Sequence, residues 1–385
     1  MTIPVVTGLE VLLEQGHPLV DGKKIGLITN HTAIDRNLRS AIDVLHHDPR
    51  FELVHLYGPE HGVRGDVQAG DHVGSATDPE TGLPVDSLYG QTRKPTPDML
   101  QGIDVLLFDI QDGGARFYTY ISTMVLAMES ANERGIPFVI LDRPNPVTGC
   151  HIAGPILDPQ FSSFVGIHPI ATRHGLTMGE LARLVASDRA WPEPHVIRMR
   201  GWQRQMWWDD TGLPFVQPSP NLPTLDSLTV YTGTCIFEAT TLSEGRGTTR
   251  PFEYIGAPWV NASALVAELR SRSLPGVGFR PTSFVPMFSK HQGETCHGVQ
   301  LHVFDREAFQ PVQTGIHMIH ALKHLPDSGF AWRAGTVLGM SANLLYGTDD
   351  LHTMIDAGAS PDDIIARWDA GQTGYREKTE AAHLY

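Results

Sequence analysis

Four short runs of almost entirely apolar residues, each followed by polar residues, constrain the fold more than any other feature of this chain. Stretches with the spacing of amphipathic helices separate them. Strands that are apolar along their whole length and alternate with helices belong to parallel sheets that are covered on both faces. The sequence therefore predicts an α/β fold, with strands over 23–30, 51–58, 104–110 and 137–142 and helices over 35–47 and 117–134.

The rest of the chain gives weaker signals. Gly135 follows the 117–134 stretch and suits the left-handed conformation that often ends a helix. Residues 150–257 are rich in Pro, Gly and Trp and contain one clear helix, which begins after Thr177 as its N-cap. Beyond them, the pattern predicts helices over 261–272, 311–323 and 361–369 and strands over 278–285 and 298–304.

The length predicts two domains, because domains average roughly 150 residues and this chain has 385. We place the boundary where the second pattern of helices and strands begins. The prediction is a Rossmann-like parallel-sheet domain over 1–257 and a smaller C-terminal α/β (or α+β) domain over 258–385.

Composition excludes several classes of protein. The chain has 43 acidic and 29 basic residues, a formal net charge of -14, and no basic run. Such a protein repels a phosphate backbone, so nucleic acid is not an expected partner. Its 41% hydrophobic content is enough to bury large cores and is typical of a globular chain rather than a disordered one.

Membrane, disulfide and metal signals are also absent from the sequence. No run of about 18 apolar residues occurs, so no membrane partner is expected. The first residues lack the basic and apolar regions of a signal peptide, which predicts a cytoplasmic protein as written, or an exported one if a leader has been trimmed. The cysteines are far apart and the histidines form no metal-ligand pattern, so neither a disulfide framework nor a metal site is expected; they are Cys150, Cys235 and Cys296.

Polar side chains follow each of the first four predicted strands. The carboxyl ends of parallel strands meet at one edge of a sheet, and ligands bind beyond that edge. We therefore expect these side chains to converge on one crevice: Asn30 and His31; Glu60, His61 and Arg64; Asp109, Gln111, Asp112, Arg116 and Tyr118; Arg143 and Asn145.

Each of these residues also has a purely structural interpretation. Asn30 could cap a turn, His61 could be a buried structural histidine, and Arg143 begins an Arg-Pro-Asn-Pro segment that could be only a rigid turn. Glu60 is harder to explain in this way. It lies between Pro59 and a His-Gly pair directly after a buried strand, where the alternative is a surface salt bridge.

A second polar segment, 243–253, places Glu244 and Arg246 between glycines on a loop that permits close approach to a ligand. The alternative is a flexible, charged surface loop. Three tryptophans could stack on a sugar, but core packing is the better prediction for most of them; they are Trp202, Trp207 and Trp208.

The familiar catalytic and cofactor motifs are missing. No GxGxxG follows the first strand, so the Rossmann-like domain lacks a dinucleotide site, and no GxxxxGK[ST], GxSxG or HExxH is present. The sequence thus predicts no cofactor. Carboxylates, arginines and aromatic residues without a cofactor suit general acid catalysis on a polar substrate.

Several long motifs then identify a family by their content and order. They are Thr-Asn-His-Thr (29–32), Gly-Pro-Glu-His-Gly-Val-Arg-Gly (58–65), the segments 81–90 and 108–120, Leu-Asp-Arg-Pro-Asn-Pro-Val-Thr-Gly (141–149) and Ser-Glu-Gly-Arg-Gly-Thr (243–248). The chain resembles the NamZ-type exo-β-N-acetylmuramidases. The resemblance is close over about residues 7–260 and looser beyond them.

This resemblance implies an activity and a site. The family removes terminal β-1,4-linked N-acetylmuramic acid from the non-reducing end of peptidoglycan fragments. It would place the active site in a cleft that the smaller C-terminal domain closes. The family's catalytic glutamate falls in Gly-Pro-Glu-His-Gly, hence on Glu60 here. The expected partner is a sugar or peptidoglycan fragment that contains muramic acid.

Glycoside hydrolysis usually needs a general acid and a second group that attacks or activates water. We assign the acid role to Glu60. For the second role we rank Asp109 or Asp112 first and Glu244 after them. The substrate's own 2-acetamido group could instead attack, with Tyr118 or Asn30 orienting it.

Muramic acid carries a lactyl carboxylate, which an arginine can bind through two parallel hydrogen bonds. We expect one or two arginines within the motifs to do so: Arg64, Arg116, Arg143 or Arg246. His31, His61, Gln111 and Asn145 complete the predicted substrate-binding set. Two other functions stay open, a non-catalytic protein that binds muramyl sugars or muropeptides and a metal-dependent muropeptide hydrolase that uses His31 and His61. The sequence does not fix the oligomeric state.

Overall fold

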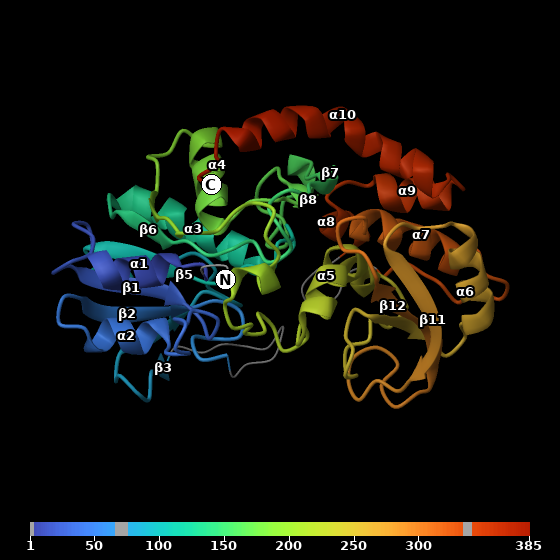
Figure 1. Ribbon diagram of the computed structural model, residues 1–385, viewed down its shortest axis with the longest axis horizontal. Coiled ribbons are helices and arrows are strands. Elements are labelled where there is room, and N and C mark those ends of the chain that lie inside the picture. Colours follow the sequence, from blue (N-terminus) through green and yellow to red (C-terminus); the bar gives the residue numbers. More distant parts are fainter. Residues whose placement is uncertain (1–3, 66–75, 334–340) are drawn as a thin grey trace.

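The computed structural model describes residues 4–65, 76–333 and 341–385. The described chain forms two lobes that lie side by side, and one long helix extends along the edge of both (Figure 1). The first lobe contains most of the N-terminal half of the chain. The second contains a smaller sheet with its own helices.

The sheet of the first lobe confirms the predicted parallel α/β fold. Its strand order is β3-β4-β2-β1-β5-β6-β9, and every pairing is parallel except that of β3 with β4. The four predicted strands form its centre. The bounds are β1 Lys24–Thr29, β2 Glu52–Gly58, β3 Ala76–Thr77, β4 Pro84–Ser87, β5 Val105–Asp109, β6 Phe138–Leu141 and β9 His195–Ile197.

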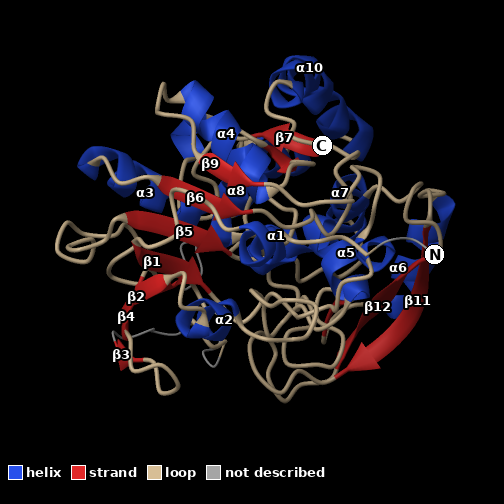
Figure 2. Ribbon diagram, turned by 60° about the vertical axis from the view of Figure 1, so that its left-hand side comes forward, coloured by secondary structure: helices blue, strands red, loops and turns tan. Residues whose placement is uncertain are grey.

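Helices cover both faces of this sheet, which is why its strands are apolar throughout. Successive side chains of a strand point to opposite faces. In β5, Leu107 therefore packs in the core under α1 (Gly8–Gln15) and α2 (Ala41–His47), whereas Phe108 packs under α3 (Thr119–Arg134) and α4 (Met178–Asp188). In Figure 2, α3 and α4 lie toward the upper left of the strands and α1 and α2 toward their lower right.

The predicted ends of two helices are confirmed. Gly135 ends α3 with φ of 65°, and its N–H donates to carbonyl groups of the last turn. Thr177 caps α4, where Thr177 and Glu180 form a capping box. The helix predicted over 35–47 begins only at Ala41, because the side chain of Asp35 accepts hydrogen bonds from backbone N–H groups and closes a turn instead.

The second lobe is built on a three-stranded antiparallel sheet of order β10-β12-β11. Its predicted elements are present. Helix α5, within the stretch where the sequence showed little periodicity, was not predicted, and it packs against α7. The bounds are α5 Leu225–Thr234, β10 Tyr254–Ala257, α6 Ala262–Ser271, β11 Val277–Phe284, β12 Cys296–Val303 and α7 Pro311–Lys323. A division of the chain at 257/258 stays a prediction.

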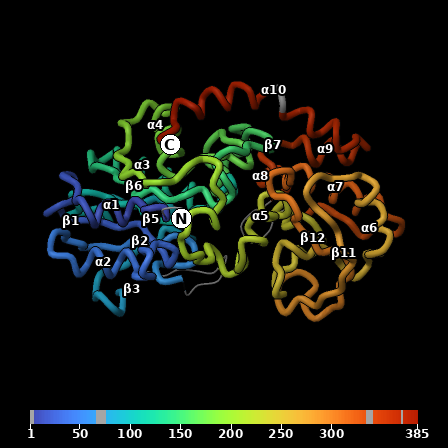
Figure 3. The backbone as a smooth tube through the Cα atoms, viewed as in Figure 1, coloured from blue at the N-terminus to red at the C-terminus, as the bar shows by residue number. Residues whose placement is uncertain are grey.

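The remaining elements connect the lobes. Helix α10, longer than predicted, reaches from α4 in the first lobe to α7 and α9 in the second (Figure 3). No helix of the described residues is long and apolar enough to cross a membrane. The bounds are β7 Ala153–Ile156, β8 Ala171–Arg173, α8 Ala342–Tyr346, α9 Asp350–Asp356 and α10 Pro361–Glu380, with 3-10 turns at Pro159–Phe161, Trp208–Thr211 and Cys235–Ala239.

The three tryptophans pack in the interior, as predicted for most of them. Trp202, Trp207 and Trp208 are all buried. The indole N–H of Trp207 donates to Glu307 of the second lobe. This hydrogen bond connects that lobe to the segment just before the 3-10 turn Trp208–Thr211. Sugar stacking on these rings is therefore excluded in this structure.

Gly233 of α5 and Gly315 of α7 allow these two helices to approach closely, and this contact yields the first prediction. A Cβ on Gly233 would overlap the backbone carbonyl of Pro311. Gly233→Ala should therefore lower the free energy of unfolding by about 1–3 kcal/mol, measured by urea denaturation, although alanine is the better helix former.

Gly374→Ala is the matched control. Gly374 lies exposed in α10 with open space around it, so alanine there should stabilise the protein by up to about 1 kcal/mol. Equal responses of the two variants would contradict the role of close α5–α7 packing.

Candidate active site

The predicted site residues lie where the strands of the first sheet end. Thr29 and Asp109 are paired at the ends of β1 and β5, and the Thr29 hydroxyl donates to the Asp109 carbonyl over 3.0 Å. The Gln111 N–H donates to the Thr32 hydroxyl over 2.9 Å. The strand arrows point from this sheet toward the second lobe (Figure 2). The loops after β1 and β5 are therefore joined at the edge that faces the second lobe.

Glu60 lies in a strained turn directly after β2. It is 9% exposed, and the Thr119 hydroxyl donates to its Oε2 over 2.8 Å. His61 and Gly62 both have positive φ, 76° and 74°, and the Gly62 N–H donates to the Pro59 carbonyl. A non-glycine residue in this region costs about 1–3 kcal/mol, and such strain clusters at functional sites. The fold thus maintains a strained backbone to position Glu60.

Buried tyrosines surround Glu60. Burial raises the pKa of Tyr89, Tyr118 and Tyr120, and the negative charge of Glu60 raises all three further. The rings of Tyr118 and Tyr120 meet edge to face, with centroids 4.9 Å apart. These phenols stay protonated at neutral pH, so they can donate hydrogen bonds near the Glu60 carboxylate.

Several buried polar atoms at this edge have no hydrogen-bond partner among the described residues. Two are donors, Nδ2 of Asn30 and the hydroxyl of Tyr118. Two are acceptors, Oε1 of Gln111 and Oδ1 of Asp112. A buried polar group without a partner costs about 1–3 kcal/mol. Donors and acceptors gathered beside Glu60 are the arrangement that a ligand rich in hydroxyl and amide groups would satisfy.

Asp109 is fully engaged by Arg143. Nε and Nη2 of Arg143 donate to the two carboxylate oxygens of Asp109 over 2.5 and 3.0 Å, and Nη2 also donates to the Ile34 carbonyl. Both side chains are buried. This geometry argues against Asp109 as the second catalytic group, because an attack on substrate would break a buried ion pair.

Asp112 is held on one side only. Its Oδ2 accepts from the Gly114 N–H over 2.7 Å and lies 3.3 Å from Nε2 of His174. His174 Nδ1 accepts from the Leu176 N–H, so its proton belongs on Nε2, which faces Asp112. Oδ1 of Asp112 has no hydrogen-bond partner in the part of the chain that the structure describes. Asp112 thus has a fixed orientation and a spare acceptor.

The segment 243–248 forms a charged network in the second lobe. Glu244 lies 2.7 Å from Lys290 Nζ and 3.5 Å from Arg246 Nε. Although burial favours the neutral carboxyl, the charges of Lys290 and Arg246 leave the pKa of Glu244 below its usual value. Arg246 also donates twice to Oε1 of Glu238. Neither carboxylate is a freely presented group.

The arginines predicted to bind the lactyl carboxylate already have partners within the protein, which are either carboxylates or backbone carbonyls. Arg64 pairs with Asp43 and with Asp78, and its hydrogen bonds hold the pKa of Asp78 at about 2. Arg116 is 1% exposed and donates to four backbone carbonyls, of Pro155, Ile170, Leu345 and Tyr346. That burial argues against the predicted contact between Arg116 and a sugar.

The other predicted residues have structural partners. Asn145 donates to the Leu176 carbonyl and accepts from the Val147 N–H, which stabilises a turn. His31 Nε2 lies 2.8 Å from the Gln217 carbonyl; burial lowers the pKa of His31, and the neighbouring His61 lowers it further. Within the described ranges, no three His, Cys, Asp or Glu side chains gather as a metal site.

Sequence reasoning missed one cation close to Glu60. Arg93 stacks over the ring of Phe164 at 4.5 Å, and that ring lies 6.0 Å from the ring of Tyr89. No ion pair of Arg93 occurs in the described part of the chain. The only sequence signal was its place three residues after the 81–90 motif.

Comparisons with known proteins identify the family of this chain. Residues 25–226 match the family "Exo-beta-N-acetylmuramidase NamZ, N-terminal", and residues 229–385 match its C-terminal counterpart. The chain belongs to the NamZ family. The peptidoglycan beta-N-acetylmuramidase NamZ of Bacillus subtilis (strain 168) is 51% identical over 362 residues, which are 94% of this chain and 86% of that protein.

Solved structures share the NamZ fold. Two DUF1343 family proteins from Bacteroides fragilis NCTC 9343 superpose on this chain with TM-scores of 0.91 and 0.79, at 39% and 32% identity. Each alignment covers 100% of this chain and 99% of the other. Both lobes and their arrangement are therefore common to the three proteins.

The Asp109–Arg143 pair yields the second prediction. Arg143→Met leaves the buried Asp109 carboxylate unpaired and should lower the free energy of unfolding by about 3–5 kcal/mol in urea denaturation. The double variant Asp109→Asn/Arg143→Met removes both charges and should lose clearly less. A double variant as unstable as the sum of the two single changes would show that the pair is not what stabilises this edge.

Proposed function

We propose that this chain is an exo-acting glycoside hydrolase that releases terminal β-1,4-linked N-acetylmuramic acid from the non-reducing end of peptidoglycan fragments. The observation that carries the proposal is the setting of Glu60, a mostly buried carboxyl beside three tyrosines and a set of unpartnered donors and acceptors. The Bacillus subtilis relative is a peptidoglycan beta-N-acetylmuramidase, which supports the choice of sugar.

In the proposed reaction Glu60 is the general acid. Its proton passes to the glycosidic oxygen as the bond from that oxygen to the anomeric carbon breaks, and water later supplies the hydroxyl of the product and returns a proton. The hydrogen bond from Thr119 fixes the carboxyl. The strained His61 turn fixes the backbone that carries it.

For the second group we now place Asp112 first. Its Oδ1 is a carboxylate oxygen without a partner among the described residues, whereas Asp109 and Glu244 each lie in ion pairs. Asp112 could accept a proton from water, or from the acetamido N–H of the substrate if that group attacks the anomeric carbon. In the second route the Tyr118 hydroxyl and Asn30 Nδ2 are the donors available to orient the acetamido group.

Recognition of the lactyl carboxylate is assigned to Arg93. The four arginines within the motifs are bound by carboxylates or by backbone carbonyls, so their charge is largely used. Arg93 lies near Tyr89 and has no ion pair among the described residues, and stacking on Phe164 holds its guanidinium plane. Arg246 is the alternative, because no bond of its Nη1 occurs among the described residues.

The test of the acid is Glu60→Gln. Release of nitrophenol from para-nitrophenyl β-N-acetylmuramic acid should fall about 10²–10⁴-fold, since the amide cannot donate the proton. Glu52→Gln is the control. Glu52 is exposed at the start of β2, the strand that leads to Glu60, so this change should leave the rate unchanged. Near wild-type turnover by Glu60→Gln would remove the assignment.

The test of specificity is Arg93→Met. Losing a charged hydrogen bond of about 1.5–3 kcal/mol should reduce the preference for muramyl over glucosaminyl substrates roughly 10- to 100-fold, seen as the ratio of kcat/KM values. Arg134→Met at the far end of α3 is the control. If Arg93→Met kept the full preference and Arg246→Met lost it, the lactyl contact would belong to Arg246.

A further inference from the structure

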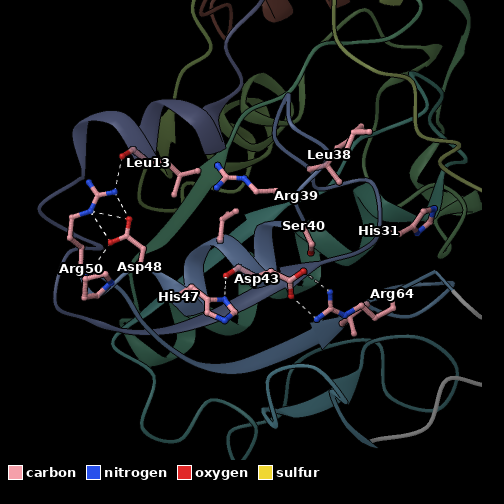
Figure 4. Close-up of a pocket in the computed structure, with 14 residues that line it drawn as sticks. Leu13, His31, Leu38, Arg39, Ser40, Asp43, His47, Asp48, Arg50 and Arg64 are labelled. Atoms are coloured by element: carbon pink, nitrogen blue, oxygen red, sulfur yellow. Dashed lines mark hydrogen bonds and ion pairs between the residues drawn. The ribbon is translucent and has the colours of Figure 1, made fainter.

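A groove of about 810 Å³ begins beside the Glu60 turn and runs along α2 (Figure 4). Its near end is formed by His31, after β1, and by Arg64, four residues after Glu60. Its far end is formed by His47, Asp48 and Arg50, at the end of α2. Because α2 runs back from the end of β1 to the start of β2, the groove leads away from the candidate active site.

A rigid turn forms the upper rim of this groove. The Asp35 carboxylate accepts hydrogen bonds from the backbone N–H groups of Asn37 and Arg39 and from Arg39 Nε. The turn presents Leu38, which is 65% exposed and has φ of 63°. A leucine in the left-handed region is unfavourable, and nothing in the core requires this one there. A strained apolar residue displayed on a groove indicates a contact surface.

The charges along the groove neutralise one another. Arg64 pairs with Asp43 at 2.9 Å, Arg50 pairs with Asp48 at 2.5 Å, and Nδ1 of His47 lies 2.7 Å from the Asp43 carbonyl. The groove thus offers fixed donors and acceptors with little excess charge. Such a lining suits the hydroxyl and acetamido groups of a sugar better than a phosphate or an acidic peptide.

We propose that this groove binds the glycan that leaves the reaction, from the first sugar after the cleaved bond onward. The inference rests on the proposed exo-muramidase function. An enzyme that holds one terminal sugar in its site must let the rest of the chain leave over its surface. The groove from His31 to His47 includes Val63 and Arg64, directly after the Glu60 turn, and so offers such a surface.

Two neighbouring histidines provide a matched test. His46 and His47 are both exposed on α2, but only His47 lines the groove. His47→Trp should fill the groove and His46→Trp should not. Binding is measured by calorimetry with a β-1,4-linked N-acetylglucosamine tetrasaccharide, which contains no muramic acid. Activity is measured on para-nitrophenyl β-N-acetylmuramic acid and on a peptide-free glycan that ends in muramic acid.

We expect His47→Trp to weaken tetrasaccharide binding about tenfold and to lower kcat/KM for the glycan by a similar factor, mainly through KM. The nitrophenyl substrate should react within twofold of wild type, because it has no glycan to place. His46→Trp should match wild type in every assay. Leu38→Gly should also weaken glycan binding while its Tm stays equal or rises, because glycine relieves the positive φ.

Three results would overturn the proposal: equal behaviour of His46→Trp and His47→Trp, equal loss on the short and long substrates, or a wild-type protein that does not bind the tetrasaccharide. Failure of the proposed function has a different signature. If wild type cleaved neither muramyl substrate but His47→Trp still lost tetrasaccharide binding, the glycan groove would stand and the hydrolase assignment would fall.

Discussion

The buried ion pair between Asp109 and Arg143 joins the loops on which the candidate site depends. Asp109 ends β5, Arg143 follows β6, and Arg143 also donates to Ile34 in the loop after β1. A buried charge is tolerated only when it is paired and hydrogen-bonded, so neither partner can leave without a large loss of stability. The edge of the sheet that carries the polar residues is therefore fixed before any substrate arrives.

This constraint separates two kinds of motif residue. Arg143, Arg116, Arg64 and Asn145 have partners within the protein and hold loops in place. Other residues keep spare hydrogen-bonding capacity, namely Tyr118, Asn30, Gln111 and Asp112. The motifs are thus dense because they contain both the supports and the groups that they support. Presence in a motif alone does not tell these two kinds apart, since the difference lies in what each side chain contacts.

The sequence could therefore predict which side chains lie at one edge of the sheet better than the contacts that each of them makes there. The apolar strands, the Gly135 helix end and the Thr177 cap follow from local rules, and the strands place Glu60 and Asp112 beyond the carboxyl edge of the sheet, as predicted. Helix α5 was missed because its burial depends on packing against α7, which no local pattern records. Arg93 was missed because the ring on which it stacks belongs to Phe164, which is distant in the sequence.

Charged side chains of the second lobe also pair with one another. Glu238, Glu244, Arg246 and Lys290 neutralise one another within it. Other contacts hold the lobes together, among them the ion pair between Arg306 and Asp209. Arg116 donates both to the β7–β8 ribbon and to carbonyls of α8, and α10 extends along both lobes (Figure 1). Since these contacts leave the unpartnered atoms near Glu60 unused, a polar ligand can satisfy them without first breaking an ion pair of either lobe.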